Sequence, residues 1–301
     1  MAKNIIYQAN AITQARYELS ALQKNILYLV MAQIKKDDAV DKKYRVSVVD
    51  MERILDNQIR PDDIRKATAS LVTKLIEVEN PGGEAGFLQM TFFSSVSYIQ
   101  KSRTIELEIS QRLKPYLFDL KEKFTTFQLD MALTVKSKYS KRLYEMLSQY
   151  KDTKKMFIKV EDLKYKLFIL DEKGGDSYPN WADFEKRILK TAQKELDEYT
   201  DIAFTYKTKK TGRKVTSLEF FISKRHIKAT SLVLPEIETL NNEQLLERLT
   251  IQFKLRKDQA LKILELYTEQ EINKRLYEIN LLVINKQISS VGGYTAKIFG
   301  V

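Results

Sequence analysis

Positively charged residues gather on one face of a predicted helix in residues 180–199. At helical spacing this segment repeats an apolar set, namely Trp181, Phe184, Ile188, Ala192, Leu196 and Tyr199. Half a turn away lies a polar set of Asp183, Lys186, Lys190, Lys194 and Asp197, with Arg187 beside it and Asn180 at the start of the helix. Such a face can reach base edges in a DNA major groove, because a helix fits that groove and lysine and arginine donate to guanine.

A second group of cations follows at a predicted hairpin turn. No acidic residue interrupts the group, which comprises Lys207, Lys209, Lys210, Arg213 and Lys214 around a Thr-Gly turn. A basic hairpin tip suits contacts with phosphates or with the minor groove. Any one of these lysines has an equally good explanation as a solvated surface charge, but their concentration on one helix face and one turn favours DNA binding.

Smaller groups of cations are weaker candidates for phosphate contact. Lys138, Lys141 and Arg142 lie near the start of a helix in SKYSKRLYEML, whose Leu143, Tyr144 and Leu147 we assign to the core. Lys101 and Arg103 lie in the turn QKSR of an earlier hairpin. The helix before that hairpin, in PDDIRKATASLVTKLIEV, has Ile64, Ala67, Leu71 and Leu75 as its apolar stripe and opposes them with Lys66, Ala69, Ser70, Thr73 and Glu77. This face has little positive charge, so we expect the later unit to be the main DNA reader.

The residues needed for catalysis are largely missing. The chain has one histidine, His226, and no cysteine, so a metal site built from a histidine pair or from thiolates is excluded. The phosphate-binding pattern G-x-x-x-x-G-K-[ST] and the nucleophile elbow G-x-S-x-G are absent. We expect His226 to be a surface or phosphate-near residue and EKGGDSYPN to be a loop. The sequence therefore predicts no enzymatic activity, no catalytic residue, no metal and no cofactor.

Composition agrees with an anionic partner inside the cell. The 301 residues carry a formal net charge of +11, and the isoelectric point is near 9.4. The start of the chain lacks the apolar run of a signal peptide, and we find no uninterrupted apolar stretch long enough to span a bilayer. We therefore expect a soluble, cytoplasmic protein.

The elements that must position these residues occur twice in the same order. From Leu19, and again from Ser137, the pattern reads helix, short strand, short helix, second helix and β-hairpin, with corresponding parts roughly 110 to 120 residues apart. That order is typical of a winged helix. We predict an α+β fold of two tandem winged-helix domains with a small helical C-terminal extension. The predicted boundaries are 1–125, 126–228 (the main DNA reader) and 229–301, a linker and helical tail.

Some segments outside the repeat also have a predicted role. Ser20 and Gln23 form a capping box at the start of the first helix. Residues 111–135 are apolar enough to be a structured connector with a short helix, so the placement of the two domains should be adjustable but not free. In the tail we expect three short helices that lean on the second unit or on a partner, and we assign no chemistry to GGYTAKIFGV.

Two motifs add a family resemblance. NAITQARYELSALQKNIL resembles the opening of Rep_3-type plasmid replication initiators, and SKYSKRLYEMLSQY resembles the start of their second winged helix. The likeness covers roughly residues 4 to 228. It implies a protein that binds direct repeats in its double-stranded origin DNA as a monomer, promotes local opening and represses its own promoter as a dimer. It also implies the host replicative helicase and the host initiator as partners.

Two other functions fit parts of the pattern. A tandem winged-helix transcriptional regulator would have the same domains without a role in initiation, and a lone palindrome near the gene would favour it. A nickase or primase is disfavoured by the missing histidine pair and phosphate loop. Repeats beside an A·T-rich segment would favour the initiator.

Overall fold

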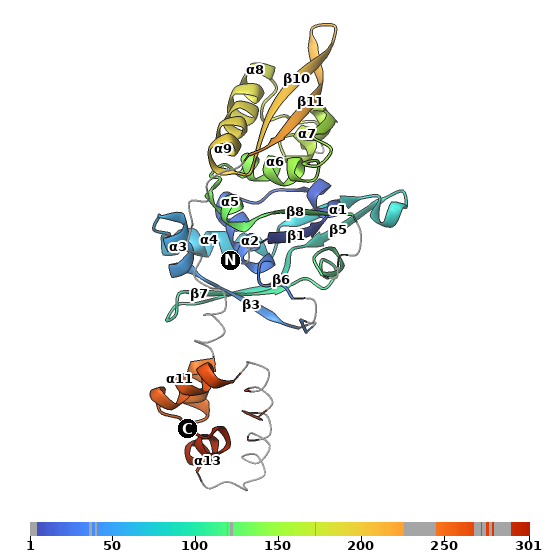
Figure 1. Ribbon diagram of the computed structural model, residues 1–301. Helices are drawn as coiled ribbons and strands as arrows, with labels where there is room; N and C mark the ends of the chain where they lie inside the picture. Colours follow the sequence, from blue (N-terminus) through green and yellow to red (C-terminus); the bar gives the residue numbers. More distant parts are fainter. Residues whose placement is uncertain are drawn as a thin grey trace. The chain divides into compact units, whose positions relative to one another are not determined.

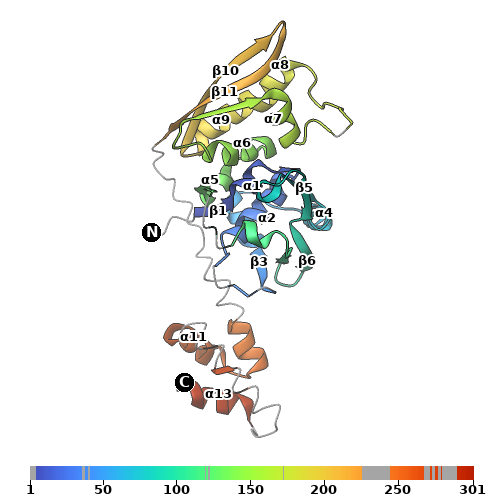
Figure 2. The same ribbon diagram turned by 90° about the vertical axis from the view of Figure 1, so that its right-hand side faces the viewer.

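The computed structural model describes residues 5–35, 38–39, 41–118, 120, 123–171, 173–225, 245–267, 272, 275–276, 279 and 290–301. The chain folds into two compact units, Met1–Leu232 and Val233–Val301. The first unit contains both winged helices (Figures 1 and 2). The second is the helical tail.

The first winged helix is built around a helix whose start was predicted. Helix α2 (Ala21–Met31) begins after Ser20, whose side chain accepts from the backbone of Gln23 while the Gln23 side chain accepts from the backbone of Ser20. Strand β3 (Lys43–Ser47), helix α3 (Val48–Leu55) and helix α4 (Pro61–Leu71) follow. The hairpin β6 (Phe93–Ile99) and β7 (Thr104–Ile109) closes a sheet in the order β3-β7-β6.

Two sequence-based boundaries in this domain are wrong. Helix α4 ends at Leu71, and Leu75 is exposed at the start of strand β4 (Leu75–Glu79), so Thr73, Leu75 and Glu77 do not lie on the helix. The apolar run after Leu71 pairs instead with β2 (Arg16–Tyr17) and β5 (Phe87–Thr91) in a separate sheet ordered β2-β4-β5. Residues 87–91 therefore do not extend the β6–β7 hairpin.

The second winged helix repeats the architecture. It comprises α6 (Lys138–Ser148), β9 (Lys155–Lys159), α7 (Val160–Lys166), a long helix in residues 181–199 and the hairpin β10 (Ile202–Thr211) and β11 (Lys214–Lys224). Its sheet order, β9-β11-β10, matches β3-β7-β6 strand for strand. The predicted fold class and the internal repeat are confirmed.

The connector between the two domains is structured, as expected. It contains the short helix η2 (Lys114–Tyr116), strand β8 (Phe124–Gln128) and helix α5 (Leu129–Thr134). Strand β8 pairs antiparallel with β1 (Ile5–Ala9), which precedes helix α1 (Asn10–Gln14), and Phe127 is buried. The first residues of the described chain thus lie beside the segment that leads into the second domain.

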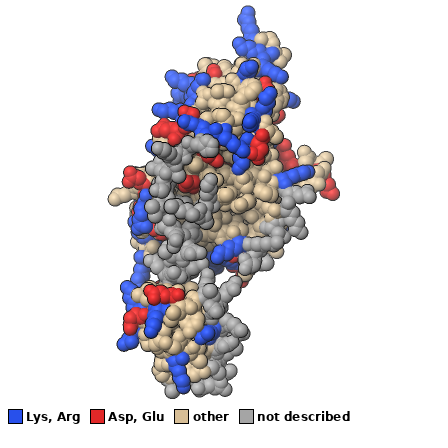
Figure 3. All heavy atoms as spheres, in the orientation of Figure 1, with Lys and Arg blue, Asp and Glu red and all other residues tan. Residues whose placement is uncertain are grey.

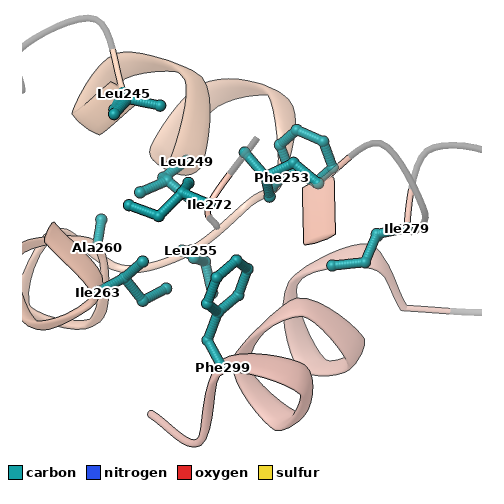
Figure 4. Close-up of a cluster of buried hydrophobic side chains, with 10 residues drawn as sticks. Leu245, Leu249, Phe253, Leu255, Ala260, Ile263, Ile272, Ile279 and Phe299 are labelled. Atoms are coloured by element: carbon teal, nitrogen blue, oxygen red, sulfur yellow. The ribbon is translucent and has the colours of Figure 1, made fainter. Parts of the chain in front are cut away.

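The tail has a hydrophobic core of its own (Figure 4). Its described elements are η4 (Arg248–Gln252), α11 (Lys257–Leu266) and α13 (Val291–Phe299). Most of the third expected helix lies outside the described residues, although Ile272, Leu276 and Ile279 are buried in this core. The GGYTAKIFGV end forms α13, and Gly292 is required there because a Cβ would lie 2.5 Å from the backbone oxygen of Lys254.

Candidate nucleic-acid interface

One continuous helix presents the predicted basic face. It consists of α8 (Trp181–Phe184), η3 (Glu185–Lys190) and α9 (Thr191–Tyr199), and we call it the recognition helix. The Asn180 side chain caps it by accepting from the Ala182 backbone at 3.0 Å, so this asparagine has a structural role at the helix N-terminus. The EKGGDSYPN segment is a loop before it, as predicted.

A π-helical turn lies in the middle of the recognition helix. Within this turn the consecutive residues Ile188 and Leu189 are both buried, whereas the sequence pattern predicted only Ile188. The Thr191 hydroxyl donates to the Lys186 backbone oxygen at 3.4 Å. A π turn of this kind changes the direction of the side chains that follow it relative to those that precede it.

The outward face of the recognition helix is basic. Lys186, Arg187, Lys190 and Lys194 are all exposed, and no described residue forms an ion pair with any of them. Lys190 Nζ lies 3.4 Å from the Gln193 amide oxygen and 5.3 Å from the centre of the Tyr206 ring. Asp183 is exposed in the first turn of the helix, where the helix dipole stabilises its negative charge.

Polar contacts fasten the recognition helix to the hairpin that follows it. Glu185 accepts from the Tyr206 hydroxyl at 2.7 Å and from the Trp181 indole nitrogen at 3.1 Å. The Gln193 amide donates to the Phe204 backbone oxygen at 2.9 Å. The helix and the wing therefore present their cations in a fixed mutual arrangement.

The β10–β11 wing carries the second predicted group. All five cations are exposed, namely Lys207, Lys209, Lys210, Arg213 and Lys214. The turn is left-handed at Gly212, with φ of 62°, which explains the Thr-Gly sequence there. Figures 1 and 2 show this tip projecting beyond the recognition helix, and Figure 3 shows Lys and Arg side chains gathered over it.

The structure separates the weaker candidates from these two groups. Lys141 and Arg142 are buried, so the prediction that these two residues contact phosphates is wrong. Lys141 Nζ donates to the Ala132 backbone oxygen at 2.5 Å, and Arg142 donates to Ala15 O at 2.9 Å. Neither side chain can reach a phosphate, because the polar face of α6 packs against the first winged helix. Lys138 is about one-third exposed and pairs with Glu18 at 2.7 Å.

In the first winged helix the candidates differ from one another. Lys101 is exposed at the β6–β7 turn, as expected for a wing tip. Arg103 instead makes two bonds to the Glu52 carboxylate at 2.8 and 3.0 Å, which fasten the turn to α3 and lower the pKa of Glu52. On α4, Arg65 is exposed beside Lys66. Arg65 was not predicted, because Lys66 and not Arg65 lies directly opposite the apolar stripe of this helix in the sequence pattern.

The described residues include no group of three or more histidine, cysteine, aspartate or glutamate side chains placed to hold a metal ion. His226 lies outside the described residues. Within the described part of the chain no helix is both long and apolar enough to cross a bilayer.

Family comparison identifies the two domains. The model of the first winged helix of the initiator replication proteins matches residues 5–148, and the model of the second matches residues 159–222. Together these ranges span more than half of the chain. This chain belongs to the initiator replication protein family.

Relatives of this initiator include two proteins from Escherichia coli. A replication initiation protein is 27% identical over 233 residues, which are 73% of this chain and 70% of the relative. The PI protein is 30% identical over 146 residues, which are 44% of this chain and 48% of that protein.

A solved structure has the same fold. The crystal structure of Pi initiator protein in complex with iteron DNA matches the initiator with a TM-score of 0.62 and 21% identity, over 75% of this chain and 100% of that one. The initiator's recognition helix and the cations of its β10–β11 wing fall within the second matched family range, whereas its tail lies beyond both ranges.

Proposed function

We propose that this initiator binds repeated sequences in its replication origin through its second winged helix and thereby promotes local opening of the DNA. The observation that carries the proposal is the set of exposed cations on the recognition helix. These cations form no ion pair with a described residue, and a wing tip with five further cations lies beside them. Membership in a family of replication initiators supports the biological setting.

The two basic groups have different tasks in this proposal. The recognition helix enters the major groove, where Lys186 and Lys190 meet base edges and supply sequence preference. The wing follows the backbone, where Lys209 and Lys210 meet phosphates and supply affinity without preference. Each phosphate contact releases condensed counterions, so binding weakens steeply as salt rises.

The first winged helix adds a second, weaker contact. Its exposed cations Arg65, Lys66 and Lys101 lie on the elements that correspond to the recognition helix and wing of the second domain. Two contacts on one stretch of DNA favour bending, and a bent site lowers the cost of opening a neighbouring A·T-rich segment.

The proposal extends to assembly and partners on the strength of family membership alone. The monomer would bind the direct repeats, and a dimer would repress the protein's own promoter. The host replicative helicase and the host initiator would then act at the opened segment. The protein would act without catalysis, in proportion to the amount bound, in the cytoplasm.

Supercoiled origin plasmid tests this function directly. The plasmid is incubated with purified protein and Mg²⁺, then examined for permanganate-reactive thymines and for strand breaks. We expect reactive thymines beside the repeats that saturate with bound protein and disappear when high salt removes it. A plasmid with scrambled repeats is the matched control. Specific binding without reactive thymines would make the protein a regulator, and a protein-linked nick would make it an enzyme.

A further inference from the structure

A buried carboxylate joins the two winged helices. Glu145 on α6 is fully buried and accepts from Lys24 Nζ at 2.5 Å, from the Tyr28 hydroxyl at 2.7 Å and from the Tyr17 hydroxyl at 3.1 Å. All three donors belong to the first winged helix, on β2 and α2. The carboxylate therefore collects hydrogen bonds from a different domain.

Arg142 completes this cluster. Its guanidinium donates to Glu145 at 2.6 Å and to the Tyr17 hydroxyl at 2.7 Å. It also donates to the backbone oxygens of Thr13 and Ala15, at 3.1 and 2.9 Å. We call Tyr17, Lys24, Tyr28, Arg142 and Glu145 the interdomain cluster. The two winged helices cannot rotate against each other unless the hydrogen bonds between α6 and the first winged helix break.

A second attachment holds the domains at another point. The Arg16 guanidinium lies 4.3 Å from the ring centres of both Tyr165 and Phe168. The Tyr165 hydroxyl donates to Glu77 at 2.8 Å, and Lys166 Nζ donates to the Gln14 backbone oxygen at 2.8 Å. These contacts join the end of α7 and the following residues to the β2-β4-β5 sheet and to α1. Two attachments on different elements oppose rotation about either one.

Opening this interface is costly because of its burial. Separating the domains would remove three donors from the Glu145 carboxylate and two backbone acceptors from Arg142, and would leave the ion pair within α6 as their remaining contact. A buried ion pair that loses its hydrogen-bond partners is strongly destabilised. These contacts therefore oppose changes in the relative placement of the two winged helices, which the sequence led us to expect to be adjustable but not free.

We infer that the interdomain cluster fixes the distance and rotation between the DNA-contacting surfaces of the two winged helices, and so sets the spacing that the protein recognises within a repeat. This inference rests on the proposed function. Two contacts on a rigid body reinforce each other only when both meet their targets at once. One inserted base pair moves the second target along the duplex and around it by about a tenth of a turn. Glu145 and Arg142 are thus positioning residues for specificity.

The test compares spacing tolerance. Wild-type protein and Glu145→Gln are titrated against an origin repeat and against versions with two or five base pairs inserted between the parts that the two domains protect. We expect wild type to lose about tenfold or more in affinity on the inserted sites. Glu145→Gln should bind the unmodified repeat more weakly and lose less than about threefold on insertion, because each domain then binds independently.

Glu18→Gln is the matched control. Glu18 also bridges the domains, because its carboxylate lies 2.7 Å from Lys138 Nζ, but each of these two side chains is 34% exposed. Removing it should leave the spacing preference unchanged, because an exposed ion pair contributes little. If Glu145→Gln does not fold cooperatively, Arg16→Ala at the second attachment replaces it.

A direct measurement of rigidity needs no DNA. The chain has no cysteine, so spin labels can be placed on Ser97→Cys and Thr153→Cys, one exposed site in each domain. We expect a narrow distance distribution in the otherwise wild-type protein and a broad one with Glu145→Gln or Arg16→Ala. Equal spacing tolerance in wild type and a folded variant, or equally narrow distributions, would overturn the inference. Failure of wild type to prefer the repeat over scrambled DNA would instead overturn the proposed function.

Discussion

The hydroxyl of Tyr28 donates to the carboxylate of Glu145 at 2.7 Å, and the two residues lie on α2 and α6, the first helices of the two repeated units. Both are fully buried. Because buried polar contacts of this kind join the two domains, the free energy of unfolding of the pair should depend on hydrogen bonds that neither domain could form alone.

Acid should weaken the interdomain cluster in a way that identifies Glu145. Burial alone would raise the pKa of this carboxyl, but Lys24, Arg142 and the Tyr28 hydroxyl lower it from 4.5 to about 2. A lowered folded-state pKa gives stability that is complete above pH 4.5 and is lost as the pH falls toward 2. Glu145→Gln should therefore be less stable than wild type by about 3–5 kcal/mol at neutral pH.

Urea unfolding of both proteins between pH 7 and pH 3 measures this contribution. The difference in unfolding free energy should shrink as the pH falls below 4.5, because wild type alone loses the Glu145 carboxylate. Comparing the two proteins cancels the carboxyls they share. A difference that stays constant down to pH 3 would contradict the assignment of the charge to Glu145.

Lys141 should affect stability and not DNA affinity. Its ammonium group donates to Ala132 O in the interior, and burial lowers its pKa. Lys141→Met keeps the chain length but leaves the carbonyl at the end of α5 unpaired, so we expect a loss of about 1–3 kcal/mol in unfolding free energy. The dependence of DNA affinity on salt should not change. Lys194→Met, which removes an exposed cation, should lower that dependence, and the opposite pattern would show that Lys141 reaches DNA.

The recognition helix should determine base preference. Lys186→Ala or Lys190→Ala should cost about 1–3 kcal/mol in binding and relax preference at particular base pairs. Lys66→Ala on α4 of the first domain should cost less. Binding to a panel of singly substituted repeats gives the comparison. A larger effect and a changed base preference for Lys66→Ala would move the main reading surface to the first domain.

The β10–β11 wing should contribute affinity without preference. Lys209→Ala and Lys210→Ala should weaken binding to every sequence alike, and each lost phosphate contact should flatten the slope of log affinity against log salt by about 0.9. Fluorescence anisotropy at several salt concentrations, with repeat and scrambled DNA, measures both quantities. Loss confined to the repeat would show that the wing reads bases.

Much of this fold follows from the sequence because the signals are local. The Ser20–Gln23 capping box, the Gly212 turn and the repeated element order depend on near neighbours in the chain, and the structure confirms each of them. The end of α4 was harder to place, since Leu75 continues the helical spacing although it lies in a strand. Strand pairing with residues 87–91 decides that boundary.

The sites were less predictable for a physical reason. On α6, Lys141 and Arg142 have the spacing of a solvated or phosphate-binding face, yet a second domain covers them. Helical periodicity cannot reveal what packs against a polar face. The same limit hid the core role of α13, where Phe299 packs on residues far earlier in the tail (Figure 4). Lys186 and Lys209, which no domain covers, are exposed as predicted.

The central claim is sequence-specific recognition of an origin repeat by the second winged helix. Its most direct test is titration of the full-length protein against a labelled repeat from its own replicon and against scrambled DNA of the same composition, at two or more salt concentrations. We predict that affinity for both falls steeply with salt, while the repeat remains preferred by about a thousandfold or more. Equal affinity for the two sequences at every salt concentration would contradict the account.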